Sequence, residues 1–271
     1  MSVGARLVPS LCVLVAAGCG GSQAIRPHRQ VAHPASSTVP PATATQSRPQ
    51  ARLPRAPSAA AQRVLFGEIP DRLPTSRRVV ALTFDAGADD AGAPRILAAL
   101  ARTGTTATFF MTGRWAQLFP HWAERIAARY PIGNHTFDHQ DLLALTLPGV
   151  RSEVLRASVA IKRATMQPPV PLFRFPYGSS NASSLALVNR LGYTAVGWTV
   201  DTLGWEGTSL GQSVSSVTSH ALAHLQPGEI VLMHVGANPH DHSTLDADAL
   251  PAIISAMRAR GYQFVTLSDY L

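Results

Sequence analysis

The stretch that decides the fold reads VVALTFDAG and spans residues 79–87. Its apolar run is uninterrupted up to Thr83, which is typical of a strand buried on both faces. A helical pattern follows over residues 94–102 and stops at Gly104, a residue favoured just past a helix end. A buried strand followed at once by a helix is the repeating unit of α/β proteins.

The same alternation continues to the end of the chain. It predicts seven strands, at 79–85, 106–111, a short one ending at 134, 172–177, 193–201, 228–234 and 262–267. It predicts six intervening helices, at 94–102, 115–130, 147–166, 182–191, 209–225 and 246–260. Strict alternation indicates parallel strands covered by helices, in an open doubly wound sheet or a barrel. The first strand is not followed by Gly-x-Gly-x-x-Gly, which disfavours a dinucleotide-binding domain.

Polar side chains follow five of these strands at or just past the point where each strand ends. They are Asp85, His135, Arg174, Asp201 and His234. The carboxyl ends of barrel strands share one face, where active sites of this architecture are built. The sequence therefore predicts an active site that contains these five side chains.

The charge of the chain is unevenly distributed. Of 271 residues, 46% are hydrophobic and the net charge is +7, which invites a nucleic-acid interpretation. The first acidic residue is Glu68, however, and arginines such as Arg26, Arg29 and Arg48 precede it. The remainder is nearly neutral and lacks the basic surface that follows phosphates, so we expect no nucleic-acid partner.

The first 18 residues are typical of an export signal. Arg6 precedes an apolar run over 7–17 that is too short to span a bilayer as a mature helix. The segment VAAGC, residues 15–19, resembles the lipobox of bacterial lipoproteins, in which Cys19 would be lipidated. We expect an extracytoplasmic protein, lipid-anchored to the cell membrane, with ordinary secretion as the alternative.

The predicted domain organisation has three parts: a lipoprotein signal peptide at 1–18, a linker at 19–76 and a catalytic domain at 77–271. The linker is rich in Pro, Ala, Ser and Arg and has no apolar periodicity until Val64. Such a composition cannot bury enough surface to offset its chain entropy.

Five short motifs fall at the strand ends. They read TFDAG at 83–87, HTFDH at 135–139, RFPYG at 174–178, DTLGW at 201–205 and LMH at 232–234. In order and spacing they resemble the motifs of the polysaccharide deacetylases, carbohydrate esterase family four, and the resemblance covers residues 79–271. It implies a distorted seven-stranded (β/α) barrel with parallel strands. It also implies removal of acetyl groups from an acetylated glycan.

The resemblance assigns the chemistry of hydrolysis to particular residues. Asp85 would be the general base on the attacking water, and Arg174 would hold its carboxylate in place. His135 and His139 would bind a divalent metal, zinc in the first place or cobalt, since two imidazoles four residues apart can reach one ion. The backbone N–H of Tyr177 would donate to the developing oxyanion.

The remaining motifs supply the acid and the acetyl slot. His234 would be the general acid, with Asp201 hydrogen-bonding its other ring nitrogen and favouring the imidazolium. Trp205 and Leu232 would wall the slot for the acetyl methyl group.

The chain departs from the family pattern at two positions. Ala86 stands where the family has the aspartate that completes an Asp-His-His metal site, and alanine has no ligand atom. Asp89 or Asp90, the pair His240 and His242, or Asp85 itself remain open as replacements. Gly204 stands in place of the second acid of Asp-x-x-Asp-Trp.

We therefore expect a metal-dependent hydrolase that removes N-acetyl groups from a cell-envelope polysaccharide, with peptidoglycan as the first candidate. Two alternatives stay open: a non-catalytic carbohydrate-binding pseudoenzyme, and an O-acetyl xylan esterase with the same machinery. Nothing in the sequence indicates an obligate protein partner.

Overall fold

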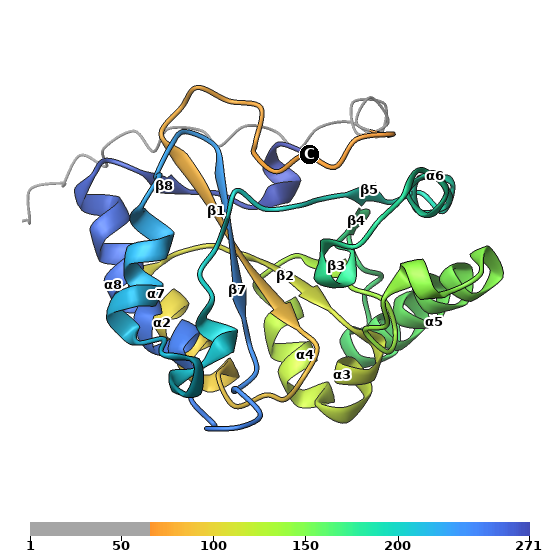
Figure 1. The fold of residues 1–271 in the computed structure, drawn as a ribbon, viewed down its shortest axis with the longest axis horizontal. Helices are drawn as coiled ribbons and strands as arrows, with labels where there is room; N and C mark the ends of the chain where they lie inside the picture. Colours follow the sequence, from red (N-terminus) through yellow and green to blue (C-terminus); the bar gives the residue numbers. More distant parts are fainter. Residues whose placement is uncertain (1–65) are drawn as a thin grey trace, which may run out of the picture. The chain divides into compact units, whose positions relative to one another are not determined.

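The computed structural model describes residues 66–271, which form one curled sheet covered by helices (Figure 1). All strand pairs in the sheet are parallel, and the order is β5-β4-β3-β2-β1-β7-β6, with β8 pairing β1. The strands are β1 (Val79–Ala86), β2 (Thr108–Met111), β3 (Ile132–Asn134), β4 (Leu172–Phe173), β5 (Thr194–Ala195), β6 (Val200–Asp201), β7 (Glu229–His234) and β8 (Gln263–Phe264).

The helices follow the predicted alternation closely. They are α2 (Ala93–Thr103), α3 (Gly113–Leu118), α4 (Pro120–Ala127), α5 (Leu147–Thr165), α6 (Ala182–Arg190), α7 (Val214–Leu222) and α8 (Leu245–Ala259). The single helix predicted over 115–130 is divided into α3 and α4. Phe119, the residue before Pro120, leaves the helical conformation at φ −125° and ψ 53°, because proline disfavours the α region in the residue before it.

The predicted strand at 193–201 is also divided, into β5 and β6. These two short strands stand at opposite ends of the sheet order. β5 pairs with β4, and β6 pairs with β7. The chain between them crosses the open side of the curled sheet, so the structure confirms the distorted parallel barrel while showing that the β5 and β6 edges are not paired with each other.

β1 forms the centre of the core. All eight of its residues are buried, and it pairs with β2, β7 and β8. Val80, Leu82 and Phe84 pack with the surrounding helices, whereas Val79 and Ala81 belong to the cluster inside the curl. Burial on both faces explains the uninterrupted apolar run in the sequence.

Residues just before position 77, where the domain was predicted to start, pack on the sheet. Leu73 is 1% exposed and its N–H donates to the carbonyl of Gly228 at 2.8 Å. The Gly197 N–H donates to Pro70, and the Thr199 hydroxyl donates to Asp71. The C-terminal end of the predicted linker therefore packs on the domain, because Leu73 fills a place in the core.

The predicted signal peptide at 1–18, the predicted lipidation site Cys19 and most of the predicted linker lie outside the described residues. Among residues 66–271, none of the helices combines the length and apolarity needed to cross a bilayer.

Candidate active site

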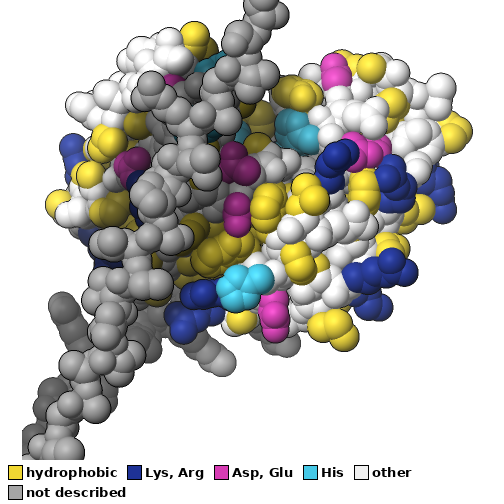
Figure 2. Space-filling model, turned by 90° about the horizontal axis from the view of Figure 1, so that it is seen from below, with side chains coloured by type: hydrophobic (Ala, Val, Ile, Leu, Met, Phe, Trp, Pro, Cys, Tyr) yellow, Lys and Arg dark blue, Asp and Glu magenta, His cyan; other side chains and the backbone are white. Residues whose placement is uncertain are grey.

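A cavity of about 540 Å³ lies where the strands end, and it gathers most of the predicted site residues. Figure 2, which views the molecule from below Figure 1, shows histidine and hydrophobic side chains side by side around a hollow. The lining residues that were predicted from the sequence are Asp85, His135, His139, Tyr177, Asp201, Trp205, Leu232 and His234. Arg174 does not line the cavity: it is fully buried and contacts Asp85.

Arg174 and Asp85 form a buried ion pair. The Arg174 Nη1 donates to Asp85 Oδ1 at 2.9 Å and to the Thr83 hydroxyl at 2.8 Å. Nη2 donates to the carbonyl of Gly197 at 3.0 Å, and the guanidinium stacks 4.2 Å from the Phe110 ring. Burial opposes ionisation of Asp85, but the charge and hydrogen bond of Arg174, together with His135 and His234, outweigh burial and lower the pKa of the Asp85 carboxyl. Asp85 is therefore held as a carboxylate with one fixed oxygen.

His135 and His139 lie next to each other at the cavity wall. Their ring centroids are 4.8 Å apart. His135 Nδ1 is 2.8 Å from the carbonyl of Arg174, and Nε2 is 3.3 Å from Asp85 Oδ2. Burial lowers the pKa of His135, and burial together with the nearby His135 lowers the pKa of His139 to about 4.

The loop that carries these two histidines is held by residues that the sequence analysis missed. Thr136 and His139 adopt left-handed φ angles of 67° and 58°, which are costly for residues other than glycine. Asn134 Oδ1 accepts the Thr136 N–H, and the Glu153 carboxylate accepts the N–H groups of residues 137 and 138 at 3.0 and 2.8 Å. Glu153 lies in the middle of α5, where nothing local marks it as other than a surface acid.

The two histidines suit a divalent metal, but the third ligand is missing. Neutral imidazole is the form that ligates, and the carbonyl bonded to His135 Nδ1 leaves Nε2 free to bind an ion. Ala86 is buried and has no donor atom. Within residues 66–271, no three His, Cys, Asp or Glu side chains are grouped so that they could hold a metal ion.

Among the described residues, Asp89, Asp90, His240 and His242 are not grouped with the two histidines as metal ligands. Asp89 Oδ1 accepts the N–H groups of Ala91 and Ala237 at 2.9 Å, so this carboxylate is committed to the loop. His240 and His242 are exposed. Asp85 is the carboxylate that lies beside His135.

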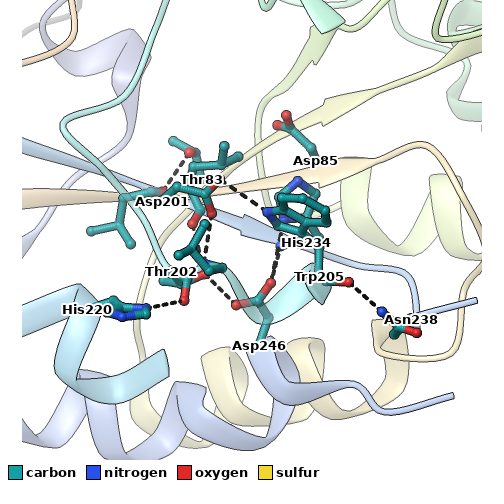
Figure 3. Close-up of polar contacts among 12 residues, drawn as sticks. Thr83, Asp85, Asp201, Thr202, Trp205, His220, His234, Asn238 and Asp246 are labelled. Carbon is teal, nitrogen blue, oxygen red and sulfur yellow. Dashed lines mark hydrogen bonds and ion pairs between the residues drawn. The ribbon is translucent and has the colours of Figure 1, made fainter. Parts of the chain in front are cut away.

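His234 has a different partner from the one predicted. Asp201 uses its two carboxylate oxygens to accept the Leu203 N–H at 2.9 Å and the Trp205 indole N–H at 3.2 Å. The carboxylate that faces His234 Nδ1 belongs instead to Asp246, whose Oδ2 is 3.6 Å from that nitrogen (Figure 3). The predicted Asp201–His234 hydrogen bond is thus not present in the structure, because the turn after β6 holds the Asp201 carboxylate on Leu203 and Trp205 while Asp246 lies at the ring nitrogen.

The electrostatics of His234 favour the charged ring. Burial lowers its pKa, but the contact with the Asp246 carboxylate and the charges of Asp246, Asp85 and Asp201 together outweigh burial and raise it. Burial raises the pKa of Asp201 itself.

Three further predicted residues form the cavity walls. Tyr177 has a left-handed φ of 58°, is 69% exposed and packs its ring 4.8 Å from that of His139. Trp205 is 46% exposed and its ring lies 6.4 Å from His234, whereas Leu232 is 3% exposed. The structure brings these residues to one cavity; the oxyanion role of Tyr177 and the acetyl-slot roles of Trp205 and Leu232 stay predictions.

Comparison with known proteins gives consistent matches. Residues 72–196 match the family model described as polysaccharide deacetylase. A peptidoglycan-N-acetylglucosamine deacetylase of Bacillus cereus is 33% identical over 72% of this chain and 68% of its own length. A chitooligosaccharide deacetylase of Sinorhizobium fredii is 34% identical over 68% of this chain and 87% of its own length.

One similar solved structure comes from a pseudoenzyme. It is a mutant, with restored enzymatic activity, of a CE4 family pseudoenzyme, and it is 26% identical with a TM-score of 0.64. The match covers 72% of this chain and 67% of the other. Taken with the five motifs, the parallel barrel and the cavity that the motif residues line, these matches show that the chain belongs to the polysaccharide deacetylase family.

Proposed function

We propose that this protein is a hydrolase that removes N-acetyl groups from a cell-envelope glycan, with the amino sugars of peptidoglycan as the substrate. The observation that carries the proposal is that Asp85 and His234, a base and an acid, line the same cavity. Each has a fixed supporting partner, Arg174 for Asp85 and Asp246 for His234. A protein that only bound glycan would not need this pair.

The reaction divides between the two side chains. The Asp85 carboxylate takes a proton from water as the water oxygen bonds to the acetyl carbonyl carbon. The backbone N–H of Tyr177 donates to the oxygen that becomes negative. The His234 imidazolium then gives its proton to the amide nitrogen, the C–N bond breaks, and acetate and the free amine of the sugar leave.

A divalent metal, zinc in the first place, fits His135 and His139 as the two protein ligands. When bound, it would polarise the acetyl carbonyl and acidify water as a Lewis acid. With Ala86 in place of a carboxylate, we expect weaker metal binding than at a three-ligand site.

The substrate class follows from the relatives and from the cavity walls. The curated relatives named above are deacetylases of peptidoglycan N-acetylglucosamine and of chitooligosaccharide. The exposed rings of Tyr177 and Trp205 stand at the cavity and offer flat apolar faces to a sugar. Lipidation at Cys19, which we also propose, would keep the domain outside the cytoplasm and close to the cell wall.

Acetate release tests the proposal. The protein is given peptidoglycan, N-acetylglucosamine oligomers and acetylated xylan, as purified, after chelation, and after zinc or cobalt is returned. We expect acetate from the amino-sugar substrates, lost on chelation, restored by metal and absent from Asp85→Asn.

Two other outcomes would overturn it. Release from xylan alone would indicate an O-acetyl esterase. Glycan binding without acetate release under any condition would indicate a binding protein, the class to which Ala86 gives some support.

A further inference from the structure

Asp246 contacts His234 although no motif contains it. It lies in the first turn of α8 and is 3% exposed. Its Oδ2 accepts the backbone N–H of His234 at 2.8 Å and lies 3.6 Å from the ring nitrogen Nδ1. Its Oδ1 accepts the Thr202 hydroxyl at 2.6 Å (Figure 3). The carboxylate is thus fixed on both oxygens and aimed at the ring.

Gly204 makes room for this carboxylate. A Cβ atom at position 204 would lie 2.5 Å from the Asp246 Cγ and 2.9 Å from Oδ2, which is closer than real Cβ contacts. Gly204 is not among the residues with positive φ, so its backbone does not require glycine. The position where the sequence pattern calls for an acid is therefore empty of side chain, and a carboxylate from α8 lies in its place.

We propose that Asp246 is the positioning residue for His234. In this exchange, glycine at position 204 replaces the acid of the DTLGW motif, and Asp246 of α8 supplies a carboxylate in its place. This inference rests on the proposed function, in which His234 is the general acid. Asp246 would keep a proton on Nδ1, so that Nε2 is the nitrogen that gives a proton to the leaving amine and is neutral afterwards.

Asp201 does not compete for this role. Its carboxylate is held by the N–H groups of Leu203 and Trp205, and among the described residues it forms no ion-pair contact with the His234 ring. Among the described residues, His234 Nδ1 is buried and has no hydrogen-bond partner within normal distance. Asp246 Oδ2 is the carboxylate oxygen that forms an ion-pair contact with it. The other charged or titratable groups that act on His234 are Asp85, Asp201, His135 and His139.

Asp246→Asn removes the charge while keeping the hydrogen bonds. The Asn oxygen can still accept the His234 N–H, and its amide can donate to the Thr202 hydroxyl. That hydroxyl has a second acceptor, the carbonyl of Leu232 at 3.1 Å. Asp248→Asn is the matched control, because Asp248 lies on the same helix and pairs with Arg95 on the surface.

We expect Asp246→Asn to lower kcat by about 10- to 100-fold with little change in KM. The alkaline limb of its pH profile should move to lower pH, and Asp248→Asn should change neither. The titration midpoint of the His234 ring, followed by NMR, should fall in the same variant. Unchanged kcat and an unmoved midpoint in Asp246→Asn, with both altered in Asp201→Asn, would overturn the proposal.

A second test moves the carboxylate from position 246 back to position 204. Gly204→Asp alone should lose stability and activity, because its side chain collides with Asp246. In the Asp246→Ala background the same change should cost little stability and should restore activity at least about 10-fold over Asp246→Ala. If the activity of the double variant falls by the product of the two single-variant losses, the two positions are independent and the exchange is contradicted.

Failure of the proposed function is separable from failure of this inference. If the wild-type protein releases no acetate from any substrate, the proposed function fails. The His234 titration and the stability of the four Gly204 and Asp246 combinations still decide whether Asp246 holds the ring.

Discussion

Arg174 and Asp85 join two distant strands through a buried ion pair, with 2.9 Å between Nη1 and Oδ1. Arg174 follows β4 and Asp85 lies near the end of β1, so the pair spans the inside of the curled sheet. It serves the fold and the site together, because the same guanidinium holds the carboxylate that faces the cavity.

Arg174→Met should destabilise the protein strongly. It leaves the Asp85 carboxylate buried without its cation, which costs about 3–5 kcal/mol. Chemical denaturation measures this loss. In the double variant Arg174→Met with Asp85→Asn the penalty should shrink, since no unpaired charge remains; an equal penalty in both would show that packing against Phe110 accounts for the loss.

Asp85→Asn should abolish measurable acetate release in a protein that still folds, with some loss of stability because the buried Arg174 charge loses its counter-ion. Asparagine cannot take a proton from water, and general-base catalysis contributes about 10²- to 10⁴-fold. Initial rates on an N-acetylglucosamine oligomer, with circular dichroism as the fold control, check this. Activity within a few-fold of wild type would show that another group is the base.

The alkaline limb of the activity profile should lie above the ordinary histidine range. Catalysis requires the His234 imidazolium, and the neighbouring carboxylates raise its pKa above 6.5. A protonated acid with a raised pKa keeps its proton to higher pH, so kcat should persist to higher pH than an ordinary histidine would allow. The dependence of kcat on pH measures it, and an alkaline midpoint below 6.5 would contradict the assignment.

Glu229 should make stability fall as the pH rises. It is 1% exposed, its Oε1 has no hydrogen-bond partner among the described residues, and burial raises its pKa from 4.5 to about 7. The folded state therefore keeps a proton that the unfolded state releases between these pH values, and stability falls across that window. Beyond about pH 7 the loss is complete.

Glu229→Gln should remove this slope. Its stability gain over wild type should grow from pH 4.5 to pH 7, measured as the free energy of unfolding. Glu124→Gln, at an exposed position of α4, is the control. A constant difference between the Glu229 variant and wild type across that range would refute the prediction.

Replacing either of two glycines, one in α3 and one in α5, by alanine should change the stability of the protein in opposite directions. A Cβ at Gly113 would lie 2.8 Å from the Ala157 Cα, so Gly113→Ala should cost about 1–3 kcal/mol through overpacking. At Gly149 the nearest atom would be 3.4 Å away in a side chain, and Gly149→Ala should stabilise α5 by up to about 1 kcal/mol. The Tm values of the two variants check this prediction. If Gly113→Ala also raises Tm, the helices have moved apart enough to accept the added methyl group, and the prediction is wrong.

The sequence by itself determined the alternating order of elements and the set of side chains at the strand ends. These are local properties: an apolar run reports burial of its own strand, and a polar residue directly after it reports its own position at the strand's carboxyl end. Asp85, His135, Arg174 and His234 could therefore be assigned to one face before any contact was known.

Only the tertiary structure decided what those side chains contact. Asp246 has a sufficient local explanation as an acid in the first turn of a helix, and Glu153 one as a charge in the middle of a helix. Their functional contacts, to His234 and to the loop after Asn134, depend on how α8 and α5 pack against the sheet. The division of residues 193–201 into β5 and β6 has the same origin, because strand pairing joins segments that are distant in sequence and leaves no periodic signal in either one.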